Sequence, residues 1–162
     1  MAFYPVAGCK FFIGTPLDEK SVDFTEADFA SMVWTEVSKW SQMGDLGDSS
    51  NLIPIQLIGE ERDKQQKGTR SGGTMQNIFV ADPTNPGQLA LMAAEKTRNN
   101  YAIKIELNDK PAVGASPKNG TRMFIGLVQN ANETGGAANT PRNLSINIPI
   151  NSNIVRTQPS AT

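Results

Sequence analysis

Apolar and polar residues alternate strictly in two stretches of this chain, and this alternation constrains the fold more than any other feature. In residues 101–107 (YAIKIEL) four apolar side chains share one side: Tyr101, Ile103, Ile105 and Leu107. Residues 143–150 (NLSINIPI) repeat the pattern with Leu144, Ile146, Ile148 and Ile150. Successive side chains of a strand point to opposite faces, so each stretch predicts a strand with one buried face. The chain is therefore predicted to be mainly β.

Other segments add strands and one helix. The further strands are predicted at residues 9–13, 31–40, 53–58, 74–81 and 122–129, with a helical turn after Thr25. In residues 31–40 the period of two places Trp34 and Trp40 on one face. The strand predicted at residues 53–58 contains Pro54, which has no N–H to donate. The strand is therefore either at the edge of a sheet, or Pro54 lies among its first residues.

The helix is predicted at about residues 86–99. Thr84 or Asn85 serves as its N-cap and Pro86 is its first residue. Its apolar stripe is expected to be Leu89, Met92 and Ala93, and its last turn carries Lys96 and Arg98, which suit the negative end of the helix dipole.

These elements predict a sandwich or barrel of two antiparallel sheets flanked by one helix. At 162 residues the chain is long enough for one domain, residues 1–162. Its core is expected at about residues 8–150, and residues 151–162 are expected to form a loose tail. The start of the sequence lacks the charged and apolar regions of a signal peptide, and no stretch is long enough to span a bilayer.

A long polar segment separates the strands predicted at residues 53–58 and 74–81. It reads GEERDKQQKGTRSGG, residues 59–73, and contains no apolar side chain. A hairpin usually closes in about two to five residues. A segment of this composition buries too little surface to offset its ordering cost. We therefore expect a long hairpin loop that is mobile in the isolated chain.

Charges are sorted along the chain although the net charge is −1. Residues 15–61 contain ten acidic and two basic residues, and residues 62–162 contain twelve basic and six acidic ones. Two interpretations stay open. Either the uneven distribution is chance and folding mixes the charges over the surface, or the fold has two oppositely charged surfaces that contact one another. The small net charge argues against a dedicated nucleic-acid or membrane binder.

The residues that usually carry catalysis or bind metal are scarce. The chain has no histidine and one cysteine, Cys9, which lies in an apolar run and is expected to be a buried thiol. Asp45 and Asp48 lack the spacing of a calcium loop, and the glycines of GTRSGGTM lack the lysine of a phosphate loop. We expect no catalytic, cofactor-binding or metal-binding residues, no cofactor and no enzyme activity.

The order of motifs along residues 31–150 resembles that of the major tail tube proteins of long-tailed bacteriophages. The motifs are VWTEVSKW, GDLG, the polar loop that ends in GTRSGG, the helix QLALMAAEK, and the pair YAIKIEL and NGTRMFIGLVQNA. None is catalytic, and each alone is a weak signal. Their shared order carries the resemblance.

The resemblance implies a fold that type VI secretion tube proteins share, and six-membered rings that stack into a hollow tail tube. A non-contractile tail is favoured, and a contractile one stays open. That tube would house the tape-measure protein and later pass DNA. The implied partners are other copies of the chain, the tape-measure protein, and tail-tip and tail-terminator proteins, with transient, non-specific passage of DNA and no membrane. The implied location is the virion tail, after synthesis in the cytoplasm of the host bacterium.

Two groups of site residues follow from the resemblance. In relatives the long loop orders against the neighbouring ring, so its charged residues are candidates for contact between rings: Glu60, Glu61, Arg62, Asp63, Lys64, Lys67 and Arg70. The inner face of a tube must be polar without binding DNA tightly, and its candidates are Gln56, Lys104, Glu106, Ser145 and Asn147. Which strand face lines the lumen stays open.

Three other functions stay open on the sequence. The first is a tube protein of a related injection machine: a type VI secretion system, a tailocin or a gene-transfer particle. The second is a β-sandwich module that binds a carbohydrate or another small ligand, which predicts an exposed aromatic patch and a stable monomer. The third is an enzyme that uses carboxylates alone. Tubes or rings would separate the assembling proteins from the other two.

Overall fold

The computed structural model describes residues 2–162, in which eleven strands, one α-helix and one 3₁₀ turn are found. In chain order these are β1 (Lys10–Pro16), the 3₁₀ turn (Glu26–Phe29), β2 (Thr35–Val37), β3 (Trp40–Gln42), β4 (Ser49–Ile55), β5 (Lys64–Ser71), β6 (Thr74–Val80), α1 (Pro86–Glu95), β7 (Tyr101–Glu106), β8 (Thr121–Gly126), β9 (Asn130–Thr134), β10 (Asn143–Pro149) and β11 (Val155–Thr157).

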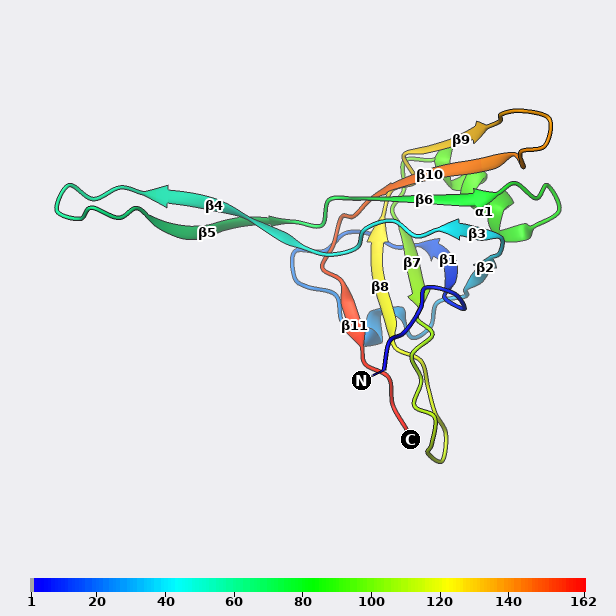
Figure 1. The fold of residues 1–162 in the computed structure, drawn as a ribbon, viewed down its shortest axis with the longest axis horizontal. Coiled ribbons are helices and arrows are strands. Elements are labelled where there is room, and N and C mark those ends of the chain that lie inside the picture. Colours follow the sequence, from blue (N-terminus) through cyan, green and yellow to red (C-terminus); the bar gives the residue numbers. More distant parts are fainter. Residues whose placement is uncertain (1) are drawn as a thin grey trace.

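The strands form two sheets and one separate hairpin (Figure 1). Sheet A has the strand order β11-β8-β7-β1-β2, and sheet B has the order β3-β6-β10-β9. All the pairings within them are antiparallel. Two antiparallel sheets with one helix confirm the predicted fold class, in its sandwich form, because the sheets do not close into a barrel.

The main core lies between the two sheets. Its largest buried side chains from sheet A are Phe11, Ile103, Ile105 and Phe124, and those from sheet B are Met75, Phe79, Leu144, Ile146 and Ile148. The alternation of the sequence therefore places strands β7 and β10 correctly, with their apolar faces toward each other. Burial of these side chains supplies the main driving force for folding, at about 25 cal/mol for each Å² of apolar surface removed from water.

Helix α1 closes the open side of the sandwich and contacts β1, β2 and β9. Asn85 is its N-cap, and the side-chain oxygen of Asn85 accepts hydrogen bonds from the backbone N–H groups of Gly87 and Gln88. The predicted cap and the predicted Pro86 start are confirmed, but the helix ends at Glu95 and not near residue 99.

The predicted apolar stripe of α1 is wrong for Leu89 and Ala93, which are exposed, whereas Met92 is half-buried and packs against the main core. The helix buries Gly87, Gln88, Leu91 and Ala94, whereas Leu89 is 51% exposed. A polar residue, Gln88, lies in the buried face because the backbone groups around it need hydrogen-bond partners. The hydropathy of the sequence alone therefore assigned the wrong face.

The predicted strand at residues 31–40 is split between the two sheets. Lys39 adopts a positive φ of 66°, and there the chain passes from β2 of sheet A to β3 of sheet B. Trp40 packs on Phe11 in the main core, at 5.4 Å between ring centroids, whereas Trp34 packs on Phe29 at 6.4 Å. The prediction that the two tryptophans share one face is therefore wrong.

A second, smaller core covers part of the outer face of sheet A. Its buried members are Phe24, Phe29, Ala102, Met123 and Ile125. They come from β7, β8 and the segment around the 3₁₀ turn, which lies where a helical turn was predicted. Sheet A is thus buried on both faces at this position.

The polar segment predicted as a loop contains a strand. Residues 64–71 form β5, which pairs with β4 from Ser49↔Ser71 to Ile55↔Lys64. Together β4 and β5 form a two-stranded hairpin, here called the arm, that projects away from the sandwich (Figure 1). The strand predicted at residues 53–58 belongs to the arm, and it begins earlier, at Ser49.

The expectation of a loose tail after residue 150 is also wrong. Val155–Thr157 form β11, which pairs with Met123 to Thr121 of β8 and forms an edge of sheet A. The side chain of Asn153 holds the backbone of Phe24 through two hydrogen bonds, of 2.7 and 3.0 Å. The tail therefore fixes the segment that covers the outer face of sheet A. Cys9, expected to be buried, is half-buried.

Candidate assembly interface

The arm is almost entirely exposed to solvent. Every residue of β4 and β5 is exposed except Ser50 and Gly68, which are half-buried. Side-chain interactions within the arm join residues of the arm to each other. The Asn51 amide donates a hydrogen bond to the Thr69 hydroxyl at 3.1 Å, and Lys64 forms an ion pair with Glu60 at 2.7 Å. An isolated two-stranded hairpin is marginally stable in water. A surface that covers the arm would therefore stabilise it.

The structure places all seven residues predicted for the contact between rings on the arm. Glu60, Glu61, Arg62 and Asp63 lie in the turn that joins β4 to β5, and Lys64, Lys67 and Arg70 lie on β5. The strand register puts Lys67 and Arg70 on the face that carries Leu52, and Lys64 on the opposite face with Ile53 and Ile55. The basic residues are therefore distributed over both faces of the arm.

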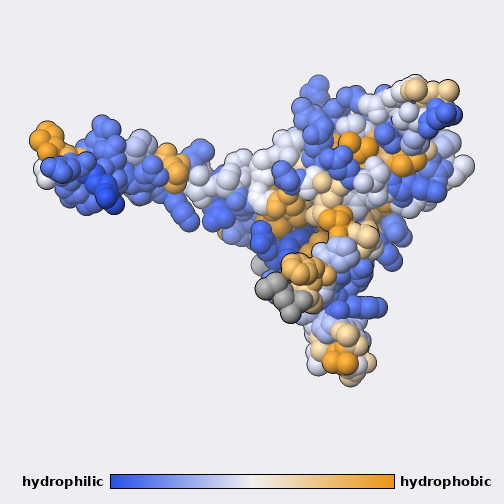
Figure 2. Space-filling model, in the orientation of Figure 1, coloured by the Kyte–Doolittle hydropathy of each residue, from blue (hydrophilic) through white to orange (hydrophobic). Residues whose placement is uncertain are grey.

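Sequence reasoning missed the apolar side chains of the arm. Five exposed apolar residues lie on β4 and in the turn: Leu52, Ile53, Ile55, Leu57 and Ile58. The arm is mostly hydrophilic, but its far end is apolar (Figure 2). The signal was present in IPIQLI, residues 53–58, whose apolar residues fall on both sides of the strand instead of on one face. Exposed apolar groups on a projecting element mark an interaction surface.

The root of the arm is packed firmly against the sandwich. A Cβ added to Gly44 would lie 2.1 Å from the Gln76 carbonyl oxygen, and one added to Gly72 would lie 2.6 Å from Ile150. Ile150 N–H donates to the Gly73 carbonyl at 2.9 Å, and Gly73 has a φ of +68° that favours glycine. The two ends of the arm are thus fixed where they leave sheet B.

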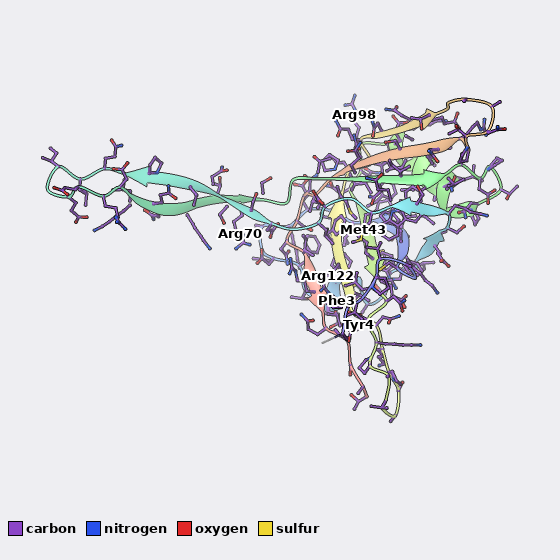
Figure 3. The ribbon with its side chains drawn as sticks, in the orientation of Figure 1. Phe3, Tyr4, Met43, Arg70, Arg98 and Arg122 are labelled. Carbon is purple, nitrogen blue, oxygen red and sulfur yellow. The ribbon has the colours of Figure 1, made fainter. Side chains whose placement is uncertain are left out.

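One ion pair joins the arm to its root. Arg70 lies 3.5 Å from Asp48, beside a polar depression of about 680 Å³ that Asp23 also lines (Figure 3). Asp48, which with Asp45 lacks the spacing of a calcium loop, contacts Arg70 in the structure. In residues 2–162 there is no group of three acidic or sulfur ligands able to hold a metal ion.

The candidates for the lumen face lie in three places. Gln56 is in the turn of the arm, Lys104 and Glu106 are on the outer face of sheet A, and Ser145 and Asn147 are on the outer face of sheet B. Lys104 lies over the rings of Phe12 and Trp34, at 4.5 and 5.0 Å from their centroids. Burial lowers the pKa of Lys104, and the nearby Glu106 carboxylate opposes that shift. The Glu106 carboxylate accepts a hydrogen bond from Asn119 at 2.9 Å.

The outer face of sheet B is uncharged. Strand register places these described residues on it: Thr74, Gln76, Ile78, Val80, Asn130, Asn132, Thr134, Asn143, Ser145, Asn147 and Pro149. Amide and hydroxyl side chains predominate, and none of these residues is ionisable. The face therefore offers hydrogen-bonding groups without a fixed charge.

No helix of the described residues is long and apolar enough to cross a membrane. No protein-family model matches the sequence, and no curated protein matches it either. Solved structures do match the fold. A chain of the anti-feeding prophage (AFP) baseplate is 10% identical with a TM-score of 0.66, over 98% of this chain and 98% of that chain.

The SPP1 tail tube protein is 10% identical with a TM-score of 0.67, over 95% of this chain and 80% of that chain. An Hcp protein is 11% identical with a TM-score of 0.48, over 87% of this chain and 88% of that chain. The first two matches carry the comparison, because they extend over nearly the whole chain. The chain has the fold of the SPP1 tail tube protein, as the resemblance in its sequence implied.

Proposed function

We propose that copies of this chain assemble into the hollow tail tube of a long-tailed bacteriophage, in a structural and not a catalytic role. The observation that carries the proposal is the exposed arm, on a fold shared with the SPP1 tail tube protein. A hairpin that lacks a covering surface and carries apolar side chains gains stability from a neighbouring copy. Proteins that order a segment on binding couple assembly to that ordering.

The proposed assembly is a stack of six-membered rings. Sheets A and B both end in edge strands, β11 and β2 in one and β3 and β9 in the other. Open edges are an aggregation hazard in a monomer, and pairing between neighbours in a closed ring removes the hazard. The arm then reaches a copy in the adjacent ring, where its charged residues favour one register.

The uncharged outer face of sheet B suits the inside of such a tube. DNA binds proteins mainly through phosphate contacts with Lys and Arg, so a wall without cations does not retain it. We place Ser145 and Asn147, and not Lys104 and Glu106, on the lumen. The tape-measure protein would fill this lumen during assembly and DNA would pass through it later, with tail-tip and tail-terminator proteins at the ends of the tube.

The similarity to a chain of the anti-feeding prophage baseplate favours a second candidate function. In that case the chain forms the tube of a related injection machine, and the assembly chemistry is the same. Genes beside the coding sequence would separate the candidates, since a terminase and a capsid gene accompany a phage tail.

Negative-stain electron microscopy of the concentrated protein tests the proposal. We expect hollow tubes or rings, either spontaneously or after addition of a tail-tip complex. A variant in which a short glycine-serine turn replaces residues 49–71 should stay a folded monomer, because the arm contributes no residue to either core. Monodisperse monomer from the intact chain, with and without the tip complex, would contradict the proposal and favour a ligand-binding module.

A further inference from the structure

The most exposed apolar residue among residues 2–162 lies at the tip of the arm. Ile58 is fully exposed, at 109%, and its neighbour Leu57 is 46% exposed. Both lie in the turn between β4 and β5, which forms the apolar far end of the arm (Figure 2). Neither side chain packs against another part of the sandwich, and neither belongs to a core. An apolar tip of this kind suits insertion into an apolar cavity of matching size.

A cavity of that kind lies beside α1. Its volume is about 140 Å³, and its apolar walls are Ala81, Pro83, Leu89 and Met92. Leu89 is exposed although it belongs to the only α-helix of the described residues, because the helix turns Gln88 and Leu91 to the core instead. The exposed side of α1 therefore presents apolar groups that the fold of one copy leaves uncovered. The cavity is large enough for one aliphatic side chain.

The arm and this cavity lie at opposite ends of the molecule. The arm extends along the longest axis, and α1 lies toward the other end of that axis (Figure 1). Copies that stack head to tail along this direction bring the arm tip of one copy to the α1 end of the next. Both sites carry charges of both signs, since Glu60, Glu61, Arg62 and Asp63 follow the tip, and Asp82, Glu133 and Arg142 line the cavity.

We propose that the arm tip, with Ile58 at its centre, inserts into the cavity between α1 and β9 of a second copy of this chain. The inference rests on the proposed tube and names the surface that receives the arm. It assigns Leu89, which is exposed in a single copy, to the interface. It also pairs opposite charges, Arg62 of the tip with Asp82 or Glu133 and Glu61 of the tip with Arg142.

Disulfide crosslinking between two single-cysteine variants tests the contact. In a Cys9→Ser background, Ile58→Cys is mixed with Leu89→Cys, and assembly is followed by mild oxidation with oxidised glutathione. A disulfide forms when the two Cα atoms approach to about 4.4–6.8 Å. The matched control mixes Ile58→Cys with Val6→Cys, because Val6 lines a second apolar cavity of about 150 Å³ beside the N-terminal segment. Both partner positions are exposed in the monomer.

We expect covalent dimers from the Leu89→Cys mixture at a yield at least tenfold above that of the Val6→Cys mixture, and only in fractions that contain tubes. Tubes without the Leu89 crosslink, or with a Val6 crosslink of equal yield, would overturn the inference and leave the tube itself in place. Absence of tubes under every condition would remove the proposed function and this inference together.

Discussion

A single buried amide fastens α1 to the rest of the fold. The Gln88 Nε2 donates to the backbone carbonyls of Val80 at 2.9 Å and Ser38 at 3.3 Å, and its Oε1 accepts from the Asp82 N–H at 2.9 Å. Gln88 is 1% exposed. The Gln88 side chain thus provides hydrogen-bond partners for backbone groups after β2, at Ser38, and at the end of β6, at Val80 and Asp82. These bonds fix which face of α1 is buried.

Replacing Gln88 by Met should lower the free energy of unfolding by about 2–3 kcal/mol, because the volume is kept while buried polar groups lose their partner. Thermal or urea denaturation of the monomer measures the change. Gln76→Met is the control, since Gln76 is exposed on the outer face of sheet B and its side chain should contribute less than about 0.5 kcal/mol. Equal stability of Gln88→Met and the parent would contradict the role of the amide.

Two glycines near the arm root should respond oppositely to alanine. Gly44 lies against the backbone of Gln76, so Gly44→Ala should cost about 2 kcal/mol or more through overpacking. An added Cβ at Gly47 meets no atom within 4 Å, so Gly47→Ala should be neutral or stabilise by up to about 1 kcal/mol. Melting temperatures of the two variants measure this difference. A Gly44→Ala variant as stable as Gly47→Ala would show that the root is loosely packed.

At the scale of single elements, the sequence predicts well where one face of a strand meets the core. The alternation of β7 and β10 is clear because Ile103, Ile105, Leu144, Ile146 and Ile148 all face the same interior. Strand β5 could not be found this way, because neither of its faces is buried and its sequence, KQQKGTRS, carries no period of two. Strand β11 is three residues long and depends on pairing with β8, which is a tertiary effect.

The candidate site could also be predicted only in part, because its exposure depends on tertiary contacts that hydropathy patterns do not show. The charged residues of the arm were predicted from the polar segment and the family resemblance, and the structure places all of them on one projecting element. The apolar tip was missed because residues 53–58 were predicted as one strand of a sheet, which made Leu57 and Ile58 its last residues and not a turn. The exposure of Leu89 was missed because the burial of Gln88 depends on backbone groups distant in the sequence.

The arm should exchange its amide hydrogens quickly in the monomer and slowly in the assembled tube. Its ladder of backbone bonds lies in solvent without a packed face, so local opening costs little until a neighbour covers it. Hydrogen exchange read by mass spectrometry over residues 60–72 measures the change. Residues 144–148 of the buried strand β10 serve as the internal control and should exchange slowly in both states. Equal exchange of the arm in both states would refute ordering on assembly.

At the scale of the whole molecule, the basic and the acidic stretches of the sequence lie on different elements. The arm carries Lys64, Lys67 and Arg70, and the acidic segment before residue 62 supplies Asp18, Glu19, Asp23, Glu26 and Asp28 over the outer face of sheet A. Two different surfaces meet in such an assembly, so opposite charges favour contact and register. One exposed ion pair contributes only about 0–1 kcal/mol, and repetition around a ring multiplies that contribution.

Replacing Lys64, Lys67 and Arg70 together by Glu should therefore abolish or greatly slow tube formation. The monomer should melt almost as the parent does, since the two ion pairs lost, Lys64–Glu60 and Arg70–Asp48, use exposed basic side chains and lie outside both cores. A control with the same change in net charge replaces the exposed residues Lys10, Lys110 and Lys118 by Glu, outside the arm and outside the edge strands. Electron microscopy beside a thermal melt separates the outcomes. Normal tubes from the arm variant would refute the role of its charges. If the control variant loses tube formation equally, the effect comes from net charge and not from the arm. An unfolded monomer would show that the arm supports the core.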